Sequence, residues 1–135
     1  MTASQVGAPL ANYLAARRVG DMLYPSGVIA VDPAARRVVT SYDDLPGSAS
    51  AALKSLGYIT GQISVDVIEA PAVAQSWFVL NRIRELVEAE GGQMRGVFKL
   101  LQYFRDLRHL ASAGIGGMLP SQASRAARND ARRSG

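Results

Sequence analysis

Residues 71–105 read PAVAQSWFVLNRIRELVEAE, GG and QMRGVFKLLQYFR, and they carry the strongest structural pattern in the chain. Apolar side chains recur there at steps of three and four residues, as at Val73, Trp77 and Leu80. This spacing places them on one face of an α-helix, whereas the charged residues lie mainly elsewhere. The stretch therefore predicts a long amphipathic helix with Trp77 in the core.

Both ends of this helix are predicted from its flanking residues. Pro71 suits the first position of a helix, where its missing N–H costs nothing. Gly91 and Gly92 suit the other end, because glycine accepts the left-handed backbone that commonly follows a helix. The sequence thus predicts a helix from Pro71 to Glu90.

Strand-like segments flank the predicted helix. Residues 96–105 are rich in aromatic and branched side chains, and residues 58–66 alternate loosely between apolar and polar. A strand, a long helix and a returning strand form a βαβ unit, in which the helix covers one face of a sheet. We therefore predict an α+β domain.

The N-terminal half of the chain predicts short antiparallel strands. Residues 11–18 and 22–24 have strand character around a Gly-Asp turn, and residues 28–31 follow as a short apolar run with hairpin-like spacing. Residues 36–41 are strand-prone because of their β-branched side chains. Residues 49–56 fit either a short helix or an ordered loop.

The composition is that of one globular domain in a chain of 135 residues, with 48% apolar and 19% charged residues. The absence of cysteine excludes disulfides and cysteine-based metal sites. No secretory signal is visible, and no run approaches the roughly 20 apolar residues of a membrane helix. We expect a cytoplasmic protein without a membrane partner.

The net charge of +4 comes mostly from one end of the chain. Residues 121–135 hold four arginines against one aspartate, so the remainder is nearly neutral. A nucleic-acid-binding domain usually spreads its basic residues over a folded face, so we do not expect nucleic acid as a partner. We divide the chain into a loose lead-in (1–10), one domain (11–110) and a basic tail that we expect to be flexible (111–135).

Three stretches share their order and spacing with a known family. The first is Asn12-Tyr13 followed by VGDMLYPSGVIAVDP at residues 19–33; the second is the helix with its Gly-Gly end; the third is the Val-x-Lys and Tyr-x-x-Asp-Leu pattern within residues 97–107. Together they resemble the RidA/YjgF family of imine and enamine deaminases, also called L-PSP endoribonuclease-like proteins. The resemblance covers roughly residues 11–110, and the order of the motifs carries it more than any single one.

The resemblance implies a chorismate-mutase-like fold, in which a long helix packs on a mixed sheet, and a homotrimer with ligand clefts between subunits. It implies hydrolytic deamination of small reactive substrates such as 2-imino acids or aminomuconate-like compounds, without a cofactor or a metal. By the same resemblance, Tyr13, Ser26 and Gly27 belong to the substrate-binding pocket.

The C-terminal part of the family pattern does not appear after Leu110. There the family has an arginine that holds the substrate carboxylate and a glutamate that activates water. The last glutamate of this chain is Glu90, and Arg125 and Arg128 lack the family's surrounding motif. We therefore expect the closing part of the fold to be missing, assign no catalytic residue, and keep a non-catalytic or truncated binding protein as the alternative. A reading-frame change would explain the Ala- and Arg-rich composition of residues 111–135.

Each candidate residue also has a purely structural interpretation. Tyr13 fits a packed strand aromatic as well as a pocket residue. The Ser26 and Gly27 pair fits an ordinary turn. His109, the only histidine, could be drawn with Asp106 and Ser26 as a catalytic triad, but such a triad is defined by geometry rather than by sequence.

Overall fold

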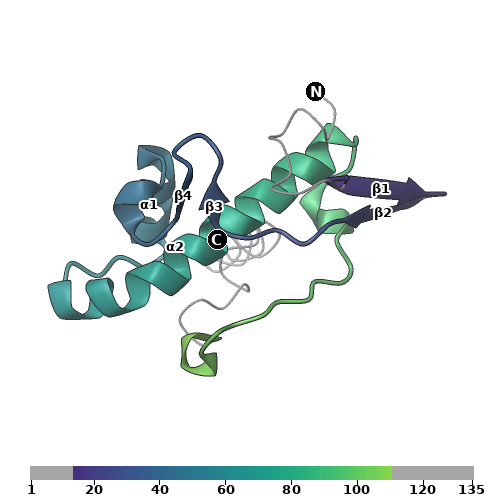
Figure 1. Ribbon diagram of the computed structural model, residues 1–135. Coiled ribbons are helices and arrows are strands. Elements are labelled where there is room, and N and C mark those ends of the chain that lie inside the picture. Colours follow the sequence, from purple (N-terminus) through teal and green to yellow (C-terminus); the bar gives the residue numbers. More distant parts are fainter. Residues whose placement is uncertain (1–13, 111–135) are drawn as a thin grey trace, which may run out of the picture.

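One long helix, α2 (Ile63–Ala89), organises the computed structural model, which describes residues 14–110 (Figure 1). The hairpin of β1 (Ala16–Val19) and β2 (Met22–Pro25) lies near the C-terminal end of α2. A second hairpin and helix α1 (Gly47–Ser55) lie along its N-terminal half. The α+β class predicted from the sequence is confirmed. Tyr13, the lead-in and residues 111–135 lie outside the described residues.

The beginning of α2 corrects the sequence prediction. The helix starts at Ile63 rather than at Pro71, and the predicted strand over residues 58–66 is wrong. The Asp66 side chain fixes the preceding loop by accepting hydrogen bonds from the Thr60 backbone N–H (2.9 Å) and hydroxyl (2.7 Å) and from the Gly61 N–H (2.9 Å). Loop and first turn therefore form one hydrogen-bonded unit.

The end of α2 is as predicted. Gly91 has a φ of 81°, and the N–H of Gly92 donates to the carbonyl of Val87 at 2.9 Å. Many helices end in this way, with a residue in the left-handed conformation followed by this backbone hydrogen bond. The helix therefore ends at Ala89, within one residue of the prediction.

The main core lies where α1 packs against α2. Residues 49–56, which fit either a helix or a loop in the sequence, belong mostly to the helix α1. Pro46 precedes the first residue of this helix. Trp77 packs at the edge of this core, which confirms its predicted place. The buried members come from four neighbouring segments: Val39, Leu45, Ala49, Leu53, Val73 and Ala74.

The strands form two separate antiparallel hairpins instead of one mixed sheet. β1 pairs with β2 so that Val19 lies opposite Met22, and β3 (Val31–Asp32) pairs with β4 (Arg37–Val38). The expected antiparallel pairing is confirmed, but β4 is shorter than the predicted strand.

The predicted strand over residues 96–105 is also wrong. A 3-10 turn (Met94–Gly96) leads into an extended segment that joins no strand among the described residues, followed by a second 3-10 turn (Leu107–Leu110). The predicted βαβ unit is therefore absent from residues 14–110. A cleft separates the extended segment from β2, so the two cannot form a ladder.

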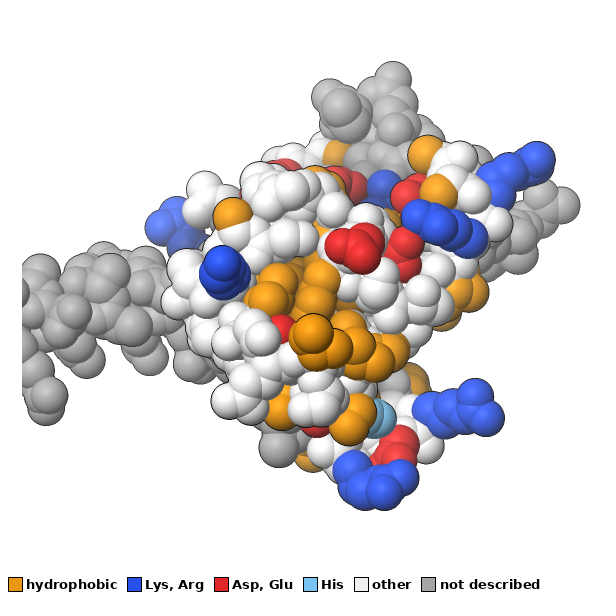
Figure 2. Space-filling model, turned by 90° about the vertical axis from the view of Figure 1, so that its left-hand side faces the viewer, with side chains coloured by type: hydrophobic (Ala, Val, Ile, Leu, Met, Phe, Trp, Pro, Cys, Tyr) orange, Lys and Arg blue, Asp and Glu red, His pale blue; other side chains and the backbone are white. Residues whose placement is uncertain are grey.

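By length and composition alone, α2 could cross a membrane, contrary to the sequence prediction, because residues 63–80 contain only two charged side chains. This is weak evidence, since the core helix of a soluble protein passes the same test, and Val73 and Ala74 of α2 are buried in the core. Figure 2 looks onto the side where α2 begins and shows hydrophobic side chains gathered near the middle of that face. Ile63 and Val67, in the first turns, are exposed.

Candidate functional site

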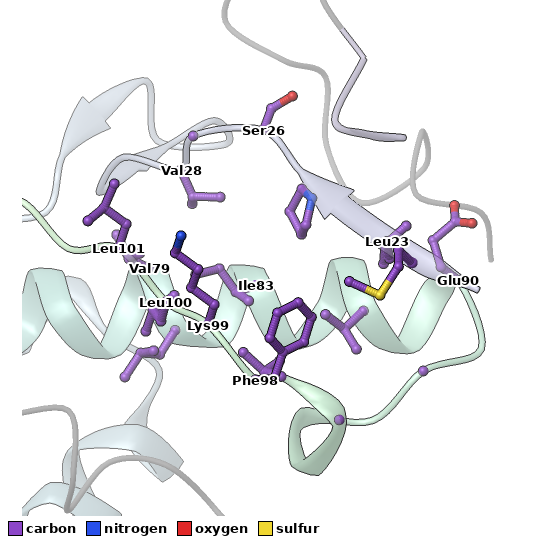
Figure 3. Close-up of a pocket in the computed structure, with 18 of the residues that line it drawn as sticks. Leu23, Ser26, Val28, Val79, Ile83, Glu90, Phe98, Lys99, Leu100 and Leu101 are labelled. Atoms are coloured by element: carbon purple, nitrogen blue, oxygen red, sulfur yellow. The ribbon is translucent and has the colours of Figure 1, made fainter. Parts of the chain in front are cut away.

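A cleft of about 680 Å³ lies between β2 and the extended segment after α2 (Figure 3). We call it the Ser26 cleft. One wall is formed by residues 22–28, the floor by α2, and the other wall by residues 96–103. Its volume is in the range of small-molecule sites. Most lining side chains are apolar, among them Leu23, Val28, Val79, Leu80, Ile83, Val87, Phe98, Leu100 and Leu101.

Ser26 and Gly27, two residues predicted for the substrate pocket, both line this cleft. The backbone N–H of Ser26 donates to the carbonyl of Ala15 at 2.9 Å, and its hydroxyl donates to the carbonyl of Leu14. Figure 3 shows the Ser26 hydroxyl directed away from the cleft. The hydroxyl therefore fastens the chain after β2 to the start of β1 and is not free to donate to a ligand.

Gly27 lines the cleft with its backbone alone. Among residues 14–110, neither a close contact nor a left-handed backbone angle requires glycine at this position, because a Cβ built there meets no described atom within 4 Å.

Arg18 and Glu90 come together at one end of the cleft, a pair that sequence reasoning missed. A guanidinium nitrogen of Arg18 donates to the backbone carbonyl of Glu90 at 2.6 Å and lies 3.9 Å from its carboxylate. Figure 3 places Glu90 near Leu23, at the end of the cleft away from Ser26. The two residues are 72 positions apart, and no local motif links them.

The remaining charged lining residues are Asp21, in the turn between β1 and β2, and Lys99, on the extended wall. Among the residues that the structure describes, no three histidine, aspartate and glutamate side chains gather as they would around a metal ion. What the cleft offers is therefore an apolar floor with a few charged groups at its rim.

The triad of His109, Asp106 and Ser26 is not formed. His109 Nδ1 lies 3.9 Å from a carboxylate oxygen of Glu69 on α2. Asp106 accepts hydrogen bonds from the Arg108 side chain, the shortest at 2.6 Å, and these lower the pKa of Asp106 to about 2. Neither residue lines the cleft beside Ser26.

Comparison with known proteins finds similarity to solved structures. No family model and no curated protein matches it. A Klebsiella pneumoniae protein, provisionally named an endoribonuclease, superimposes with a TM-score of 0.67 at 42% sequence identity. The match covers 75% of this chain and 70% of the Klebsiella chain. At this identity and coverage, the chain belongs to the family of that Klebsiella pneumoniae protein, and its endoribonuclease name is one that RidA/YjgF/L-PSP proteins carry.

Proposed function

We propose that this protein is a RidA-type hydrolase that deaminates small imines or enamines in the Ser26 cleft. The observation that carries the proposal is the position of the Ser26 and Gly27 turn, which forms one wall of a cleft of small-molecule size. The family relationship supports it, since the name of the Klebsiella pneumoniae neighbour is used for RidA/YjgF proteins. The chorismate-mutase-like assignment of the fold is part of the same proposal.

The reaction needs one water molecule and one group that can hold its proton. The water oxygen bonds to the carbon of the C=N group while a carboxylate takes one proton from that water and passes it to the nitrogen, which gives a carbinolamine. The nitrogen then receives the second proton of the water, from the new hydroxyl group, the C–N bond breaks, ammonia leaves and a carbonyl remains. Glu90 is the carboxylate we assign to this step, because it lines the cleft and Arg18 holds its backbone carbonyl in place.

The test is hydrolysis of a 2-imino acid that an amino acid oxidase generates in the assay. We expect the full chain to accelerate ammonia release over buffer, and Glu90→Gln to reduce the rate by about 100-fold or more, as loss of a general base does. Glu88→Gln is the matched control, since Glu88 is exposed near the same helix end and does not line the cleft. Equal rates for wild type and Glu90→Gln would contradict the role of Glu90 as the general base. If the wild-type protein did not accelerate the reaction, the proposed activity itself would be contradicted.

A binding protein without turnover is the second candidate. The pairing of Arg18 with Glu90, away from Ser26, favours it, because both groups are then partly used by one another. In this case a stable 2-oxo acid would bind in the cleft while the imine hydrolysed at the buffer rate. The hydrolysis assay and a binding assay on the same sample therefore separate the two candidates.

RNA is a third candidate only through the name of the neighbour. Four arginines of the described chain already face carboxylates: Arg18 with Glu90, Arg37 with Asp44, Arg82 with Glu85 and Arg108 with Asp106. Residues 14–110 carry 11 basic and 10 acidic side chains, a balance that does not suit a surface for phosphates. We therefore propose small imines rather than RNA as the substrate.

We also propose a cytoplasmic homotrimer. Several apolar side chains of the β1–β2 hairpin and the chain after it are exposed, including Val19 (58%), Tyr24 (55%) and Ile29 (60%). Exposed apolar surface of this kind is typical of regions that contact another protein. Contact between copies would cover it.

A further inference from the structure

The extended segment after α2 carries backbone groups without partners. Val97 donates its N–H to the carbonyl of Met94 at 3.1 Å, and the next backbone hydrogen bonds along the chain lie within residues 106–109. Between them, residues 98–104 neither donate nor accept a hydrogen bond through their backbone within the described part of the chain. Branched and aromatic side chains, which are typical of strands, dominate the segment. It is therefore a strand edge that lacks a neighbour.

This strand edge borders the Ser26 cleft. All residues from 96 to 103 line the cleft in an unbroken run. Successive side chains of an extended chain point to opposite faces, so an unbroken run lines a cleft through its backbone as well as its side chains. Figure 3 shows Phe98 and Leu101 on one side of the cleft and the chain that carries Ser26 and Val28 on the other. A peptide lying in the cleft would therefore have the unpartnered backbone beside it.

The opposite wall presents a second edge. In the described chain β2 pairs only with β1, and the Ser26 N–H extends this ladder by bonding to Ala15. Neighbouring residues of an antiparallel strand direct their backbone groups to alternate sides, so Leu23 and Pro25 direct theirs away from β1. Both line the cleft, whereas Tyr24 between them does not. Leu23 offers an N–H and a carbonyl to the cleft, and Pro25 offers a carbonyl.

The floor of the cleft contains one polar side chain among apolar ones. Ser76 is 6% exposed and is the one buried polar side chain within residues 14–110. Its hydroxyl makes no hydrogen bond with this part of the chain. The hydroxyl is open to the cleft, because only Oε2 of Glu69 among the described side chains lacks both solvent contact and a hydrogen bond. Buried polar groups normally have a partner, so a ligand that covers this floor should supply one.

We propose that the Ser26 cleft binds an extended segment of another protein, which pairs as an added strand with residues 97–103. A peptide backbone suits the unpartnered groups on both walls, because it alternates donors and acceptors at the spacing of a strand. Its inward side chains are branched and apolar, with one small hydroxyl side chain opposite Ser76. The segment needs no net charge, because the lining charges are two cations and two anions: Arg18, Lys99, Asp21 and Glu90. This role goes beyond the proposed function, because the peptide is bound and not converted.

The probe is acetyl-Thr-Val-Thr-Ser-Thr-Val-Thr-amide, which has the length of residues 97–103 and places its valines and serine on one face. Amide hydrogen exchange of the full chain, followed by NMR, shows which backbone groups pair with it. We expect saturable binding and slower exchange at every second amide of residues 98–103, because only alternate N–H groups of a strand face a given neighbour. The measurement contains no imine, so its result does not depend on the hydrolysis assay.

Proline variants at two neighbouring positions give a matched pair. Leu100→Pro and Leu101→Pro each remove one N–H, and neither N–H is bonded within residues 14–110. Only one of the two faces the peptide, so one variant should weaken binding about tenfold, the scale of a lost hydrogen bond, and the other much less. Circular dichroism shows whether both variants are folded.

Ser76→Ala tests the contact with the floor. Wild type should prefer the probe about threefold over a version with valine in place of the serine, because only the serine can bond to the Ser76 hydroxyl. Ser76→Ala should lose this preference.

Absence of saturable binding up to about 1 mM peptide would overturn the proposal. Equal affinities of wild type and both proline variants, or an unchanged preference in Ser76→Ala, would overturn it too. Protection of residues 98–103 in the chain alone would show that the chain itself covers this edge. Protection that rises with protein concentration would show that a second copy covers it, and either result would contradict a peptide of another protein as the occupant.

Discussion

At the scale of single residues, Asp66 fixes the loop that leads into α2. Its carboxylate accepts hydrogen bonds from Thr60 and Gly61, and these bonds lower the pKa of Asp66 below its ordinary value. Hydrogen bonds to the charged form favour that form, which is the cause of the shift. The same contacts explain why α2 begins before Pro71.

We predict that Asp66 makes the protein sensitive to acid. Because the pKa of Asp66 is lower in the folded than in the unfolded chain, its contribution is present above about pH 4 and is lost as the pH falls through the folded pKa. Asp66→Asn should lower Tm at neutral pH and reduce the fall in Tm between neutral and acidic pH. Thermal melts across that range test this.

Asp43→Asn is the comparison, since Asp43 is exposed and its side chain has no bonding partner among residues 14–110. Its pH profile of Tm should follow that of wild type. If Asp66→Asn followed the wild-type profile too, the role of Asp66 in fixing the loop before α2 would be incorrect.

Sequence motifs located some site residues and not others. Ser26 and Gly27 were found because a contiguous motif carries them, and local pattern is visible in one sequence. Arg18 and Glu90 were not found, because they are 72 positions apart and meet only when β1 lies at the end of α2. Lys99 belongs to the Val-x-Lys motif of residues 97–99, but its place in the cleft depends on the facing wall, which residues 22–28 form.

At the scale of elements, the two ends of α2 show what a sequence can reveal about a helix. The Gly91 and Gly92 end is local chemistry, since only glycine readily takes the left-handed backbone that the stop requires. The beginning of α2 depends on the loop whose backbone bonds to Asp66, and this loop places the helix start at Ile63 although Pro71 suggests a later one. The segment 96–105 has strand composition, but strand formation needs a neighbour beside it, and composition does not supply one.

Pro71→Ala distinguishes the structure from the sequence prediction. Within α2, Pro71 lacks the N–H that would bond to the carbonyl of Val67, so alanine should stabilise the protein by about 1–3 kcal/mol. At the first position of a helix, the same change would be nearly neutral. Urea denaturation measures the difference, and an unchanged midpoint would indicate that the helix begins at Pro71.

At the scale of the whole molecule, the described residues leave apolar surface on two sides. The beginning of α2 exposes Ile63 and Val67, and the β1–β2 hairpin exposes Val19 and Tyr24. The Ser26 cleft adds an apolar floor along the helix between them. We interpret the hairpin surface as the contact between copies and the cleft as the ligand site.

The association proposal predicts the mass of the protein in solution. Light scattering after size-exclusion chromatography should give three times the chain mass of 14.3 kDa. Tyr24→Ser should shift the trimer toward smaller species, because it removes apolar surface from the contact. A monodisperse monomer at the same concentration would contradict the proposal.

The central claim is that the Ser26 cleft is the ligand site, and amide chemical-shift mapping of the full chain with the stable 2-oxo acid α-ketoisocaproate tests it most directly. The account predicts that the largest shifts fall on residues 26–28 and 96–101, which face one another across the cleft. Saturable shifts confined instead to residues outside the cleft, such as those around Glu69 and His109, or no saturable shift anywhere, would contradict it.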